Sequence, residues 1–235
     1  MYRFESRVRF SEVDESGRLP ISSIVNYFQD CSTFQSEDLG VGVEYLHTMQ
    51  LVWVVNSWQI IVDRYPSLGE HITIGTAPHI LRNFMGERNF YMLDESGTMI
   101  AKANSIWTLL STENNHPTRI PDFIMEKYTL KEAIPMEYAP RKIALPKEGG
   151  ELQESFLVHA GHLDTNHHVN NGQYINMALA YMNVQGDVKQ LRAEYCNQAR
   201  LGDLITPKRY EVDGQSIVAL NDENGKPYAV VSLQQ

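Results

Sequence analysis

Residues 162–174, HLDTNHHVNNGQY, bring carboxylate, amide and imidazole side chains together in one short run. Asp164, Asn166 and His168 occupy alternate positions of this run, just before an apolar pattern that predicts a helix. A carboxylate can act as a base or a nucleophile, an imidazole can transfer protons, and an amide can orient a water molecule or a carbonyl group without titrating. We therefore treat these three side chains as the candidate catalytic groups.

Several members of the run also have a purely structural interpretation. Asp164 could cap the helix that follows, because aspartate is favoured at helix N-termini. Asn170 and Asn171 are better explained as capping and turn-filling residues, and His167 as a solvated neighbour. The sequence alone leaves both roles open for Asp164.

A metal site was the other chemistry to consider, because four histidines cluster in and before the run. They are His159, His162, His167 and His168. No cysteine lies among them, and a strand at 155–163 would direct His159 and His162 to opposite faces. We therefore expect no metal and no cofactor.

A weaker copy of the run lies near the N-terminus and indicates an internal duplication. VDESGRLPISSIVNYF (13–28) aligns with LDTNHHVNNGQYINMA (163–178) at a constant offset, so that Asp14 falls on Asp164 (164 − 14 = 150). The residues after Asp14 in the first copy, ESGR, include no equivalent of Asn166 or His168. We therefore expect its site to be degenerate and the chain to carry one functional site.

Each copy leads into an amphipathic helix with apolar residues at i, i+3, i+4 and i+7. These residues are Ile21, Ile24, Val25, Phe28 and Cys31 in the first copy, and Tyr174, Met177, Ala178 and Tyr181 in the second. A strand-like run precedes each helix, RVRFSEV (7–13) or SFLVHAGHL (155–163). Downstream, RYPSLGEHITIGT resembles NQARLGDLITPKRY, and both halves contain a hairpin pattern with a glycine turn.

Each half therefore predicts a strand, a long helix and three or more antiparallel strands, which is an α+β fold. Two such halves can pair their sheets edge to edge into one continuous sheet that wraps both helices. We expect an N-terminal repeat over 1–128, a linker rich in Pro, Gly and charge over 129–152, and a C-terminal repeat over 153–235.

Composition narrows the class of protein. Hydrophobic residues make up 43% and charged residues 21%, which is ordinary for a globular chain, and the net charge of -9 argues against general nucleic-acid binding. The two cysteines, Cys31 and Cys196, form no secreted-type framework, and the first residues lack the long apolar core that is typical of a signal peptide. No run approaches the ~18 apolar residues of a membrane span. We expect a cytoplasmic protein without a membrane span, for which a homodimer is possible.

The motifs resemble those of a known family. LDTNHHVNNGQYI is similar to the Leu-Asp-x-Asn-x-His-Val-Asn-Asn-x-x-Tyr signature of the acyl-acyl carrier protein thioesterases, best known from plants. WVVNSWQIIVDRYPSLGE and SIWTLLSTENNHPTRIP resemble two further segments of that family. The resemblance implies a double hotdog fold, the helix-wrapped-by-sheet unit written twice. It also implies hydrolysis of fatty acyl thioesters on acyl carrier protein, in fatty acid biosynthesis.

The family's reacting polar groups map onto Asp164, Asn166 and His168. The family also carries a Glu-Cys pair on a strand, and the matching positions here are Gln198 and Ala199. A cysteine nucleophile at that position cannot operate in this chain, and Gln198 can bind and orient but cannot act as a base. This departure favours Asp164 as the reacting group. It could act as a general base on water or as a nucleophile that forms a mixed anhydride.

Two further parts of the site are expected. Backbone N–H groups at the helix start near Val169 would polarise the thioester carbonyl. Apolar residues of the first repeat would line a tunnel for the acyl chain, although each could equally be ordinary core. The candidates are Ile24, Phe28, Trp53, Val55 and Trp58.

Three other functions are alternatives to this reaction. An acyl-coenzyme A thioesterase would use the same pantetheine arm. A non-catalytic acyl-binding protein gains some support from the missing Glu-Cys pair. A dehydratase on the same architecture would display a Gly-His-Phe-Pro type loop, which this sequence lacks.

Overall fold

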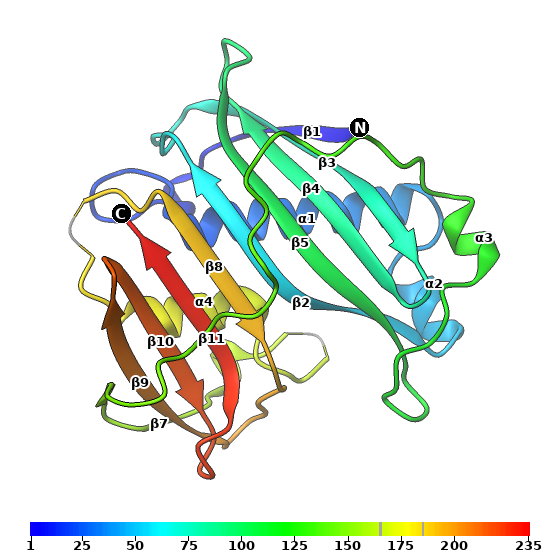
Figure 1. The fold of residues 1–235 in the computed structure, drawn as a ribbon. Coiled ribbons are helices and arrows are strands. Elements are labelled where there is room, and N and C mark those ends of the chain that lie inside the picture. Colours follow the sequence, from blue (N-terminus) through cyan, green and yellow to red (C-terminus); the bar gives the residue numbers. More distant parts are fainter. Residues whose placement is uncertain (165, 185) are drawn as a thin grey trace. The chain divides into compact units, whose positions relative to one another are not determined.

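The computed structural model of the protein describes residues 1–164, 166–184 and 186–235 (Figure 1). It divides into two compact units, one formed by 1–56 with 60–139 and the other by 57–59 with 140–235. Each unit is an α-helix packed on an antiparallel sheet, which confirms the predicted α+β class. Apart from residues 57–59, the chain enters the second unit after Ala139, inside the segment predicted as the linker.

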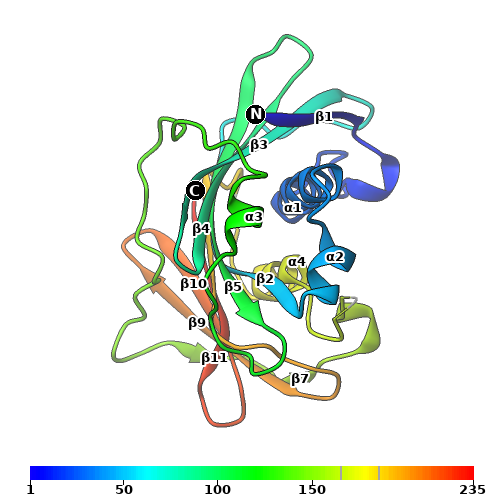
Figure 2. The same ribbon diagram turned by 90° about the vertical axis from the view of Figure 1, so that its right-hand side faces the viewer.

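The first unit has the sheet order β1-β3-β4-β5-β2. Its elements are β1 (Tyr2–Arg7), α1 (Ile21–Asp38), α2 (Val43–Thr48), β2 (Leu51–Val62), β3 (His71–Arg82), β4 (Met85–Leu93), β5 (Met99–Ser111) and α3 (Asp122–Met125). A 3-10 turn, η1, covers Phe10–Glu12. Helix α1 lies against one face of this sheet, in contact with β1 and β3 (Figure 2).

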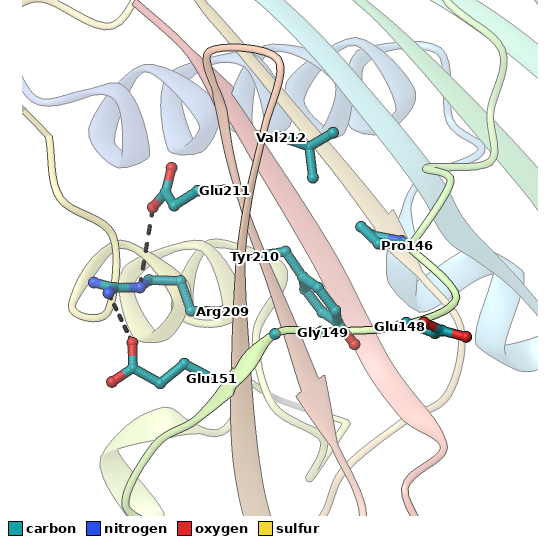
Figure 3. A pocket seen from close by; sticks show the side chains of 9 residues that line it. Pro146, Glu148, Gly149, Glu151, Arg209, Tyr210, Glu211 and Val212 are labelled. Atoms are coloured by element: carbon teal, nitrogen blue, oxygen red, sulfur yellow. Dashed lines mark hydrogen bonds and ion pairs between the residues drawn. The ribbon is translucent and has the colours of Figure 1, made fainter.

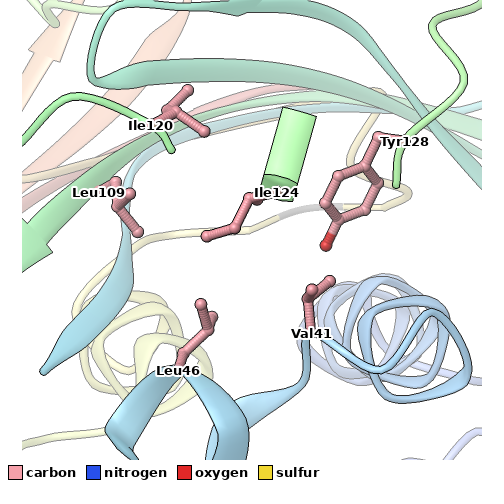
Figure 4. Packing of buried hydrophobic residues seen from close by; sticks show 6 residues of the cluster. All are labelled: Val41, Leu46, Leu109, Ile120, Ile124 and Tyr128. Atoms are coloured by element: carbon pink, nitrogen blue, oxygen red, sulfur yellow. The ribbon is translucent and has the colours of Figure 1, made fainter. Parts of the chain in front are cut away.

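The apolar stripe predicted for α1 is the part of the helix that packs on the sheet. Ile24, Val25, Phe28 and Cys31 are all fully buried, and the Phe28 ring lies 5.3 Å from the ring of Phe90 on β4. Burying an Ile or Phe side chain contributes about 2 kcal/mol each, which fixes the helix on this face. A second apolar cluster fills the space beside α2 and α3 (Figure 4). It contains Val41, Leu46, Leu109, Ile120, Ile124 and Tyr128.

The second unit has the sheet order β8-β11-β10-β9-β6, and β7 also pairs with β9. Its elements are β6 (Glu151–Leu152), β7 (Phe156–Leu157), η2 (Ala160–His162), α4 (Asn171–Leu179), β8 (Gln190–Tyr195), β9 (Leu204–Val212), β10 (Gln215–Asn221) and β11 (Pro227–Gln234). Helix α4 contacts β10 and β11. No helix in the described part of the chain is both long and apolar enough to cross a bilayer.

The internal duplication extends to individual backbone hydrogen bonds. In the first unit the N–H of Leu19 donates to the carbonyl of Pro66 (2.9 Å), and in the second the N–H of Val169 donates to that of Ala199 (3.0 Å). The same agreement holds for Val8 with Gly69 and Glu70, matched by Val158 with Gly202 and Asp203. The predicted repeat is therefore confirmed, including the downstream match of the PSLGE and ARLGD segments.

Three local predictions were wrong. Two of them, one in each copy, concern the strand expected before the helix, and the third concerns the end of the second helix. The strand-like runs 7–13 and 155–163 are strand only at their start, and then form the turns η1 and η2. In η2 the N–H of His159 donates to Nδ1 of His162 (3.0 Å), so the two rings lie 5.7 Å apart instead of on opposite faces. Helix α4 ends at Leu179, so Tyr181 leaves the helical stripe and stacks on Phe156.

The linker is extended and is tied to the sheets by side chains. Within the first unit, Asn89 Oδ1 accepts hydrogen bonds from the N–H of Ile134 (3.0 Å) and the hydroxyl of Tyr138 (3.1 Å). Within the second unit, Glu194 Oε2 accepts from the N–H of Ile143 (2.8 Å). These bonds satisfy backbone groups of a segment that has little regular structure of its own.

Arg88 on β4 is a buried cation that the sequence pattern did not predict. Its Nη1 donates to Gln35 Oε1 on α1 (2.6 Å) and to the hydroxyl of Thr76 (3.3 Å), and its guanidinium lies 5.5 Å from the ring centre of Tyr128. Desolvation lowers the pKa of Arg88. Within the described residues no carboxylate forms an ion pair with Arg88. Hydrogen bonds to neutral acceptors therefore stabilise the buried charge.

We expect Gln35→Met to destabilise the protein by about 2 kcal/mol, because it removes an acceptor from a buried charge. Urea denaturation measures the change. Gln35→Glu keeps an acceptor and adds a countercharge, so it should retain wild-type stability or exceed it. Equal unfolding midpoints for Gln35→Met and the wild type would contradict this account of Arg88.

Candidate active site

Asp164 closes a tight turn between η2 and α4. Its Oδ1 accepts hydrogen bonds from the N–H groups of Asn166 (2.8 Å) and His168 (3.2 Å). Its own N–H donates to the carbonyl of His168 (2.8 Å), and its carbonyl accepts from the N–H of His167 (3.1 Å). Oδ2 makes no hydrogen bond with any other residue that the structure describes. The turn therefore uses Oδ1 as its acceptor, and Oδ2 remains available to a bound molecule.

The same turn occurs at three other places in the described part of the chain, with the sequences DESGR, DESGT and DENGK. Each begins with an aspartate, Asp14, Asp94 or Asp222, whose Oδ1 accepts from the N–H groups two and four residues later. The N–H and carbonyl of each aspartate also make the same two backbone bonds. Asp164 therefore has a structural role, because its side chain accepts the backbone hydrogen bonds of the turn. It does not cap α4, whose N-cap is Asn170.

His167 makes the fourth turn different from the other three. The fourth residue of each turn is in the left-handed region, with φ of +73° at Gly17, +80° at Gly97, +76° at Gly225 and +60° at His167. Glycine adopts this region freely, whereas a residue with a Cβ pays about 1–2 kcal/mol. The His167 side chain is exposed and makes no hydrogen bond within the described residues. The sequence comparison of DTNHH with the three glycine turns was the signal that could have singled it out.

His168 is partly buried beside this turn. Desolvation lowers the pKa of its imidazole below the ordinary value of 6.5, the nearby Arg200 and His167 lower it further, and Asp164 opposes them. His168 is therefore neutral at pH 7. A neutral imidazole has one N–H donor and one acceptor nitrogen, so it can donate a hydrogen bond to a carbonyl oxygen.

The segment after the turn and helix α4 are tied to Ala199, in the loop that follows β8, by two hydrogen bonds. The N–H of Val169 donates to the carbonyl of Ala199, and the N–H of Ala199 donates to the hydroxyl oxygen of Tyr174 (2.8 Å). Tyr174 is buried on α4, and burial raises its pKa well above the usual range, so the hydroxyl stays protonated. The sequence presented Tyr174 only as core, but it also anchors the segment that holds the turn.

We expect Tyr174→Phe to lower kcat by about tenfold while KM changes little, because Ala199, which holds Val169, loses its own bond to α4 while the turn keeps its side chains. The unpaired N–H of Ala199 should also cost about 1–3 kcal/mol of stability. Initial-rate kinetics and urea denaturation measure the two effects. Tyr181→Phe is the matched control, since that hydroxyl makes only a long 3.4 Å bond to the carbonyl of Glu154.

Three of the N–H groups expected to polarise a carbonyl at the helix start already have partners within the chain. The N–H of Val169 is bonded to Ala199, that of Asn170 to the carbonyl of His162 (2.9 Å), and that of Gly172 to Oδ1 of Asn170 (2.8 Å). The last bond makes Asn170 the N-cap of α4, as predicted. These three N–H groups are therefore engaged within the chain, and whether another N–H group near Val169 polarises a carbonyl stays a prediction.

The positions aligned with the family's Glu-Cys pair follow β8. Gln198 is exposed, whereas the methyl group of Ala199 is fully buried. Cys196 is three residues earlier, and burial raises the pKa of its thiol to about 11, so it is a thiol and not a thiolate at neutral pH. Asn166 is exposed at the tip of the turn.

The five residues named for the acyl chain all lie on α1 and β2. Ile24, Phe28, Val55 and Trp58 are fully or almost fully buried, and Trp53 packs against the cluster of Figure 4. Their burial fits both interpretations given above, a tunnel wall and ordinary core, so their contact with an acyl chain stays a prediction.

An open groove of about 360 Å³ lies elsewhere in the second unit, between residues 146–151 and β9 (Figure 3). Arg209 lies between two carboxylates there, 2.8 Å from Glu151 and 4.0 Å from Glu211. The groove shares no residue with the Asp164 turn. Its charged lining does not suit an acyl chain, so we assign it no part in the site.

The chain is similar to acyl-ACP thioesterases of known sequence. It is 23% identical over 192 residues to a chloroplastic acyl-acyl-carrier-protein hydrolase of Cuphea viscosissima, which covers 76% of this chain and 46% of the relative. It is 22% identical over 248 residues to oleoyl-acyl carrier protein thioesterase 1 of Arabidopsis thaliana, which covers 95% of this chain and 68% of that protein. The chain thus spans about half the length of the first of these relatives.

Two solved structures share the fold over nearly the whole chain. An acyl-ACP thioesterase from Bacteroides thetaiotaomicron matches with a TM-score of 0.89 at 20% identity, covering 99% of this chain and 96% of that one. A 12:0-ACP thioesterase from Umbellularia californica matches with a TM-score of 0.87 at 18% identity, with the same coverage. At these identities the likeness shows the fold, which is the predicted double hotdog.

A family model provides the assignment. The model described as the acyl-ACP thioesterase N-terminal domain matches residues 1–128, which is more than half of the 235 residues. The chain belongs to the acyl-ACP thioesterase family.

Proposed function

We propose that this protein hydrolyses fatty acyl thioesters on acyl carrier protein, releasing the free fatty acid and the carrier thiol. Membership of the family supports the reaction class and the carrier. The observation that carries the proposal is the Asp164 turn, which holds a carboxylate with one unused oxygen, an exposed amide and a neutral imidazole within five residues.

In the proposed reaction, Asp164 Oδ2 removes a proton from a water molecule, whose oxygen attacks the thioester carbonyl carbon. The neutral imidazole of His168 and the amide of Asn166 donate hydrogen bonds to the carbonyl oxygen as it becomes negative. The carbon–sulfur bond then breaks, the sulfur leaves with the electron pair, and it receives the proton taken from water. No residue is acylated in this sequence of steps.

Gln198 takes the place of the acid that the resemblance leads one to expect. Its exposed amide can hydrogen-bond a substrate but cannot accept a proton in the pH range of the reaction. The proposal therefore places the base on Asp164 alone. This is also the feature on which a purely acyl-binding protein would differ, because binding needs no base.

Thiol release from a set of acyl carrier proteins of different acyl chain length tests the function. The proposal expects turnover by the unmodified protein, with a higher kcat/KM for the carrier thioester than for the coenzyme A thioester of the same acid. The opposite preference would favour the coenzyme A thioesterase. Tight binding without turnover would favour the non-catalytic acyl-binding protein.

A further inference from the structure

His167 occupies a turn position at which the three similar turns have glycine. In the three other turns with the same hydrogen bonds, residue four is Gly17, Gly97 or Gly225, and a Cβ built there would meet no atom within 4 Å. The preference for glycine is therefore due to the left-handed backbone and not to crowding. A histidine fits this turn sterically but is strained in it.

Nothing inside the described chain offsets that strain. The imidazole of His167 is exposed and makes no hydrogen bond with the residues that the structure describes, whereas its neighbour His168 is partly buried. Strained non-glycine residues that persist without an internal contact are typical of functional sites. The partner of this imidazole is therefore to be sought in a bound molecule.

The exposure of His167 distinguishes the two branches of a thioester. The acyl branch is apolar and requires shielding from water, so an exposed imidazole does not suit it. The other branch, the pantetheine arm, carries amide groups and must reach the site through solvent from its carrier. An imidazole can donate a hydrogen bond to an amide carbonyl or accept one from an amide N–H.

We propose that His167 is a substrate-contact residue that hydrogen-bonds the pantetheine arm of the thioester. This inference rests on the proposed function and on the place of His167 next to His168 in the Asp164 turn. The arm is common to acyl carrier protein and coenzyme A, so the contact serves both substrates. Such a contact explains why the Asp164 turn, unlike the turns at Asp14, Asp94 and Asp222, has a histidine where they have glycine.

Two variants separate the imidazole from the strain. His167→Gly removes both, and His167→Ala removes the imidazole but keeps a Cβ in the left-handed backbone. Each is assayed by thiol release with three thioesters of one acyl group, carried on acyl carrier protein, on coenzyme A and on ethanethiol. Ethanethiol has no arm, so its thioester reports on the Asp164 chemistry without the proposed contact.

The expected result is a loss of about tenfold in kcat/KM for the carrier and coenzyme A thioesters in both variants, the effect of one hydrogen bond. The ethanethiol thioester should react at the wild-type rate. His167→Gly should also raise Tm by about 2 °C, and His167→Ala should leave it unchanged. The matched control, Gly225→His, introduces the same strain in a sister turn and should lower Tm by a similar amount without changing kcat/KM.

Several results would overturn the proposal. They are unchanged kcat/KM on both armed substrates, an equal loss on the ethanethiol thioester, or a loss confined to the carrier, which would place His167 against the carrier's protein surface. If the unmodified protein releases thiol from none of the three, the proposed function itself fails, and this contact with it.

Discussion

Asp164→Asn should lower kcat for carrier-bound thioesters by about 10³-fold and leave Tm unchanged. The asparagine side chain keeps a carbonyl oxygen where Oδ1 now accepts from the N–H groups of Asn166 and His168, so the turn persists. What it loses is the second carboxylate oxygen, which is the proposed base. Thiol release and thermal unfolding of the same preparation give the two readouts.

Asp164→Ala provides the contrast for that prediction. It removes the turn's acceptor as well as the base, so it should lose activity to the same extent and also lose about 1 kcal/mol of stability, or about 3 °C in Tm. Asp222→Ala, in a sister turn of the same unit, should show the stability loss without the loss of activity. If Asp164→Asn keeps wild-type kcat while Asp164→Ala does not, the carboxylate only holds the turn.

His168→Ala should lower kcat by about 10²-fold with a small change in KM, because a donor to the developing oxyanion is lost. His168→Gln retains an amide N–H donor and should recover part of the rate. Full activity of His168→Ala would show that the imidazole takes no part in the reaction. Arg200→Gln is a useful companion, since it removes a positive charge that lowers the pKa of His168.

The lowered pKa of His168 also fixes a pH dependence. The proposed reaction uses the neutral imidazole, and the folded pKa of His168 lies below its ordinary value, so the acid limb of kcat/KM should lie below the pH at which a free imidazole titrates. The sign for stability follows from the same shift. Protonation favours the unfolded chain, so the contribution of His168 is complete above its unfolded pKa and is lost as the pH falls through the folded pKa. Arg200→Gln should move the acid limb of kcat/KM toward higher pH.

The duplication, the two helices and the turn residues were predictable because they depend on local patterns. The offset that aligned Asp14 with Asp164 also aligned their turns, and the apolar stripe of α1 became its packed face. The family signature indicated Asp164, Asn166 and His168, which lie in one turn of the structure, and their part in catalysis stays a prediction. Sequence patterns of this kind report which residues share an element or a loop.

The failures depend on which partner a polar group finds. Alternation of apolar residues could not show that His159 and His162 bond within a 3-10 turn, since their hydrogen bond overrides the strand pattern. The N–H of Val169 looked available at a helix start, but it is used by Ala199, which is distant in sequence. The buried environment of Arg88 arises in the same way, from a helix and two strands that meet only in the fold.

The duplication supplies its own reference for the central claim. Asp14→Asn and Asp164→Asn make the same change in two turns with the same backbone-to-carboxylate hydrogen bonds. The residue four positions after the aspartate is Arg18 in the first turn and the partly buried His168 in the second. Initial rates of thiol release from an acyl carrier protein should be unchanged in the first variant and reduced about 10³-fold in the second. Equal rates in the two variants would contradict a catalytic carboxylate in the second unit.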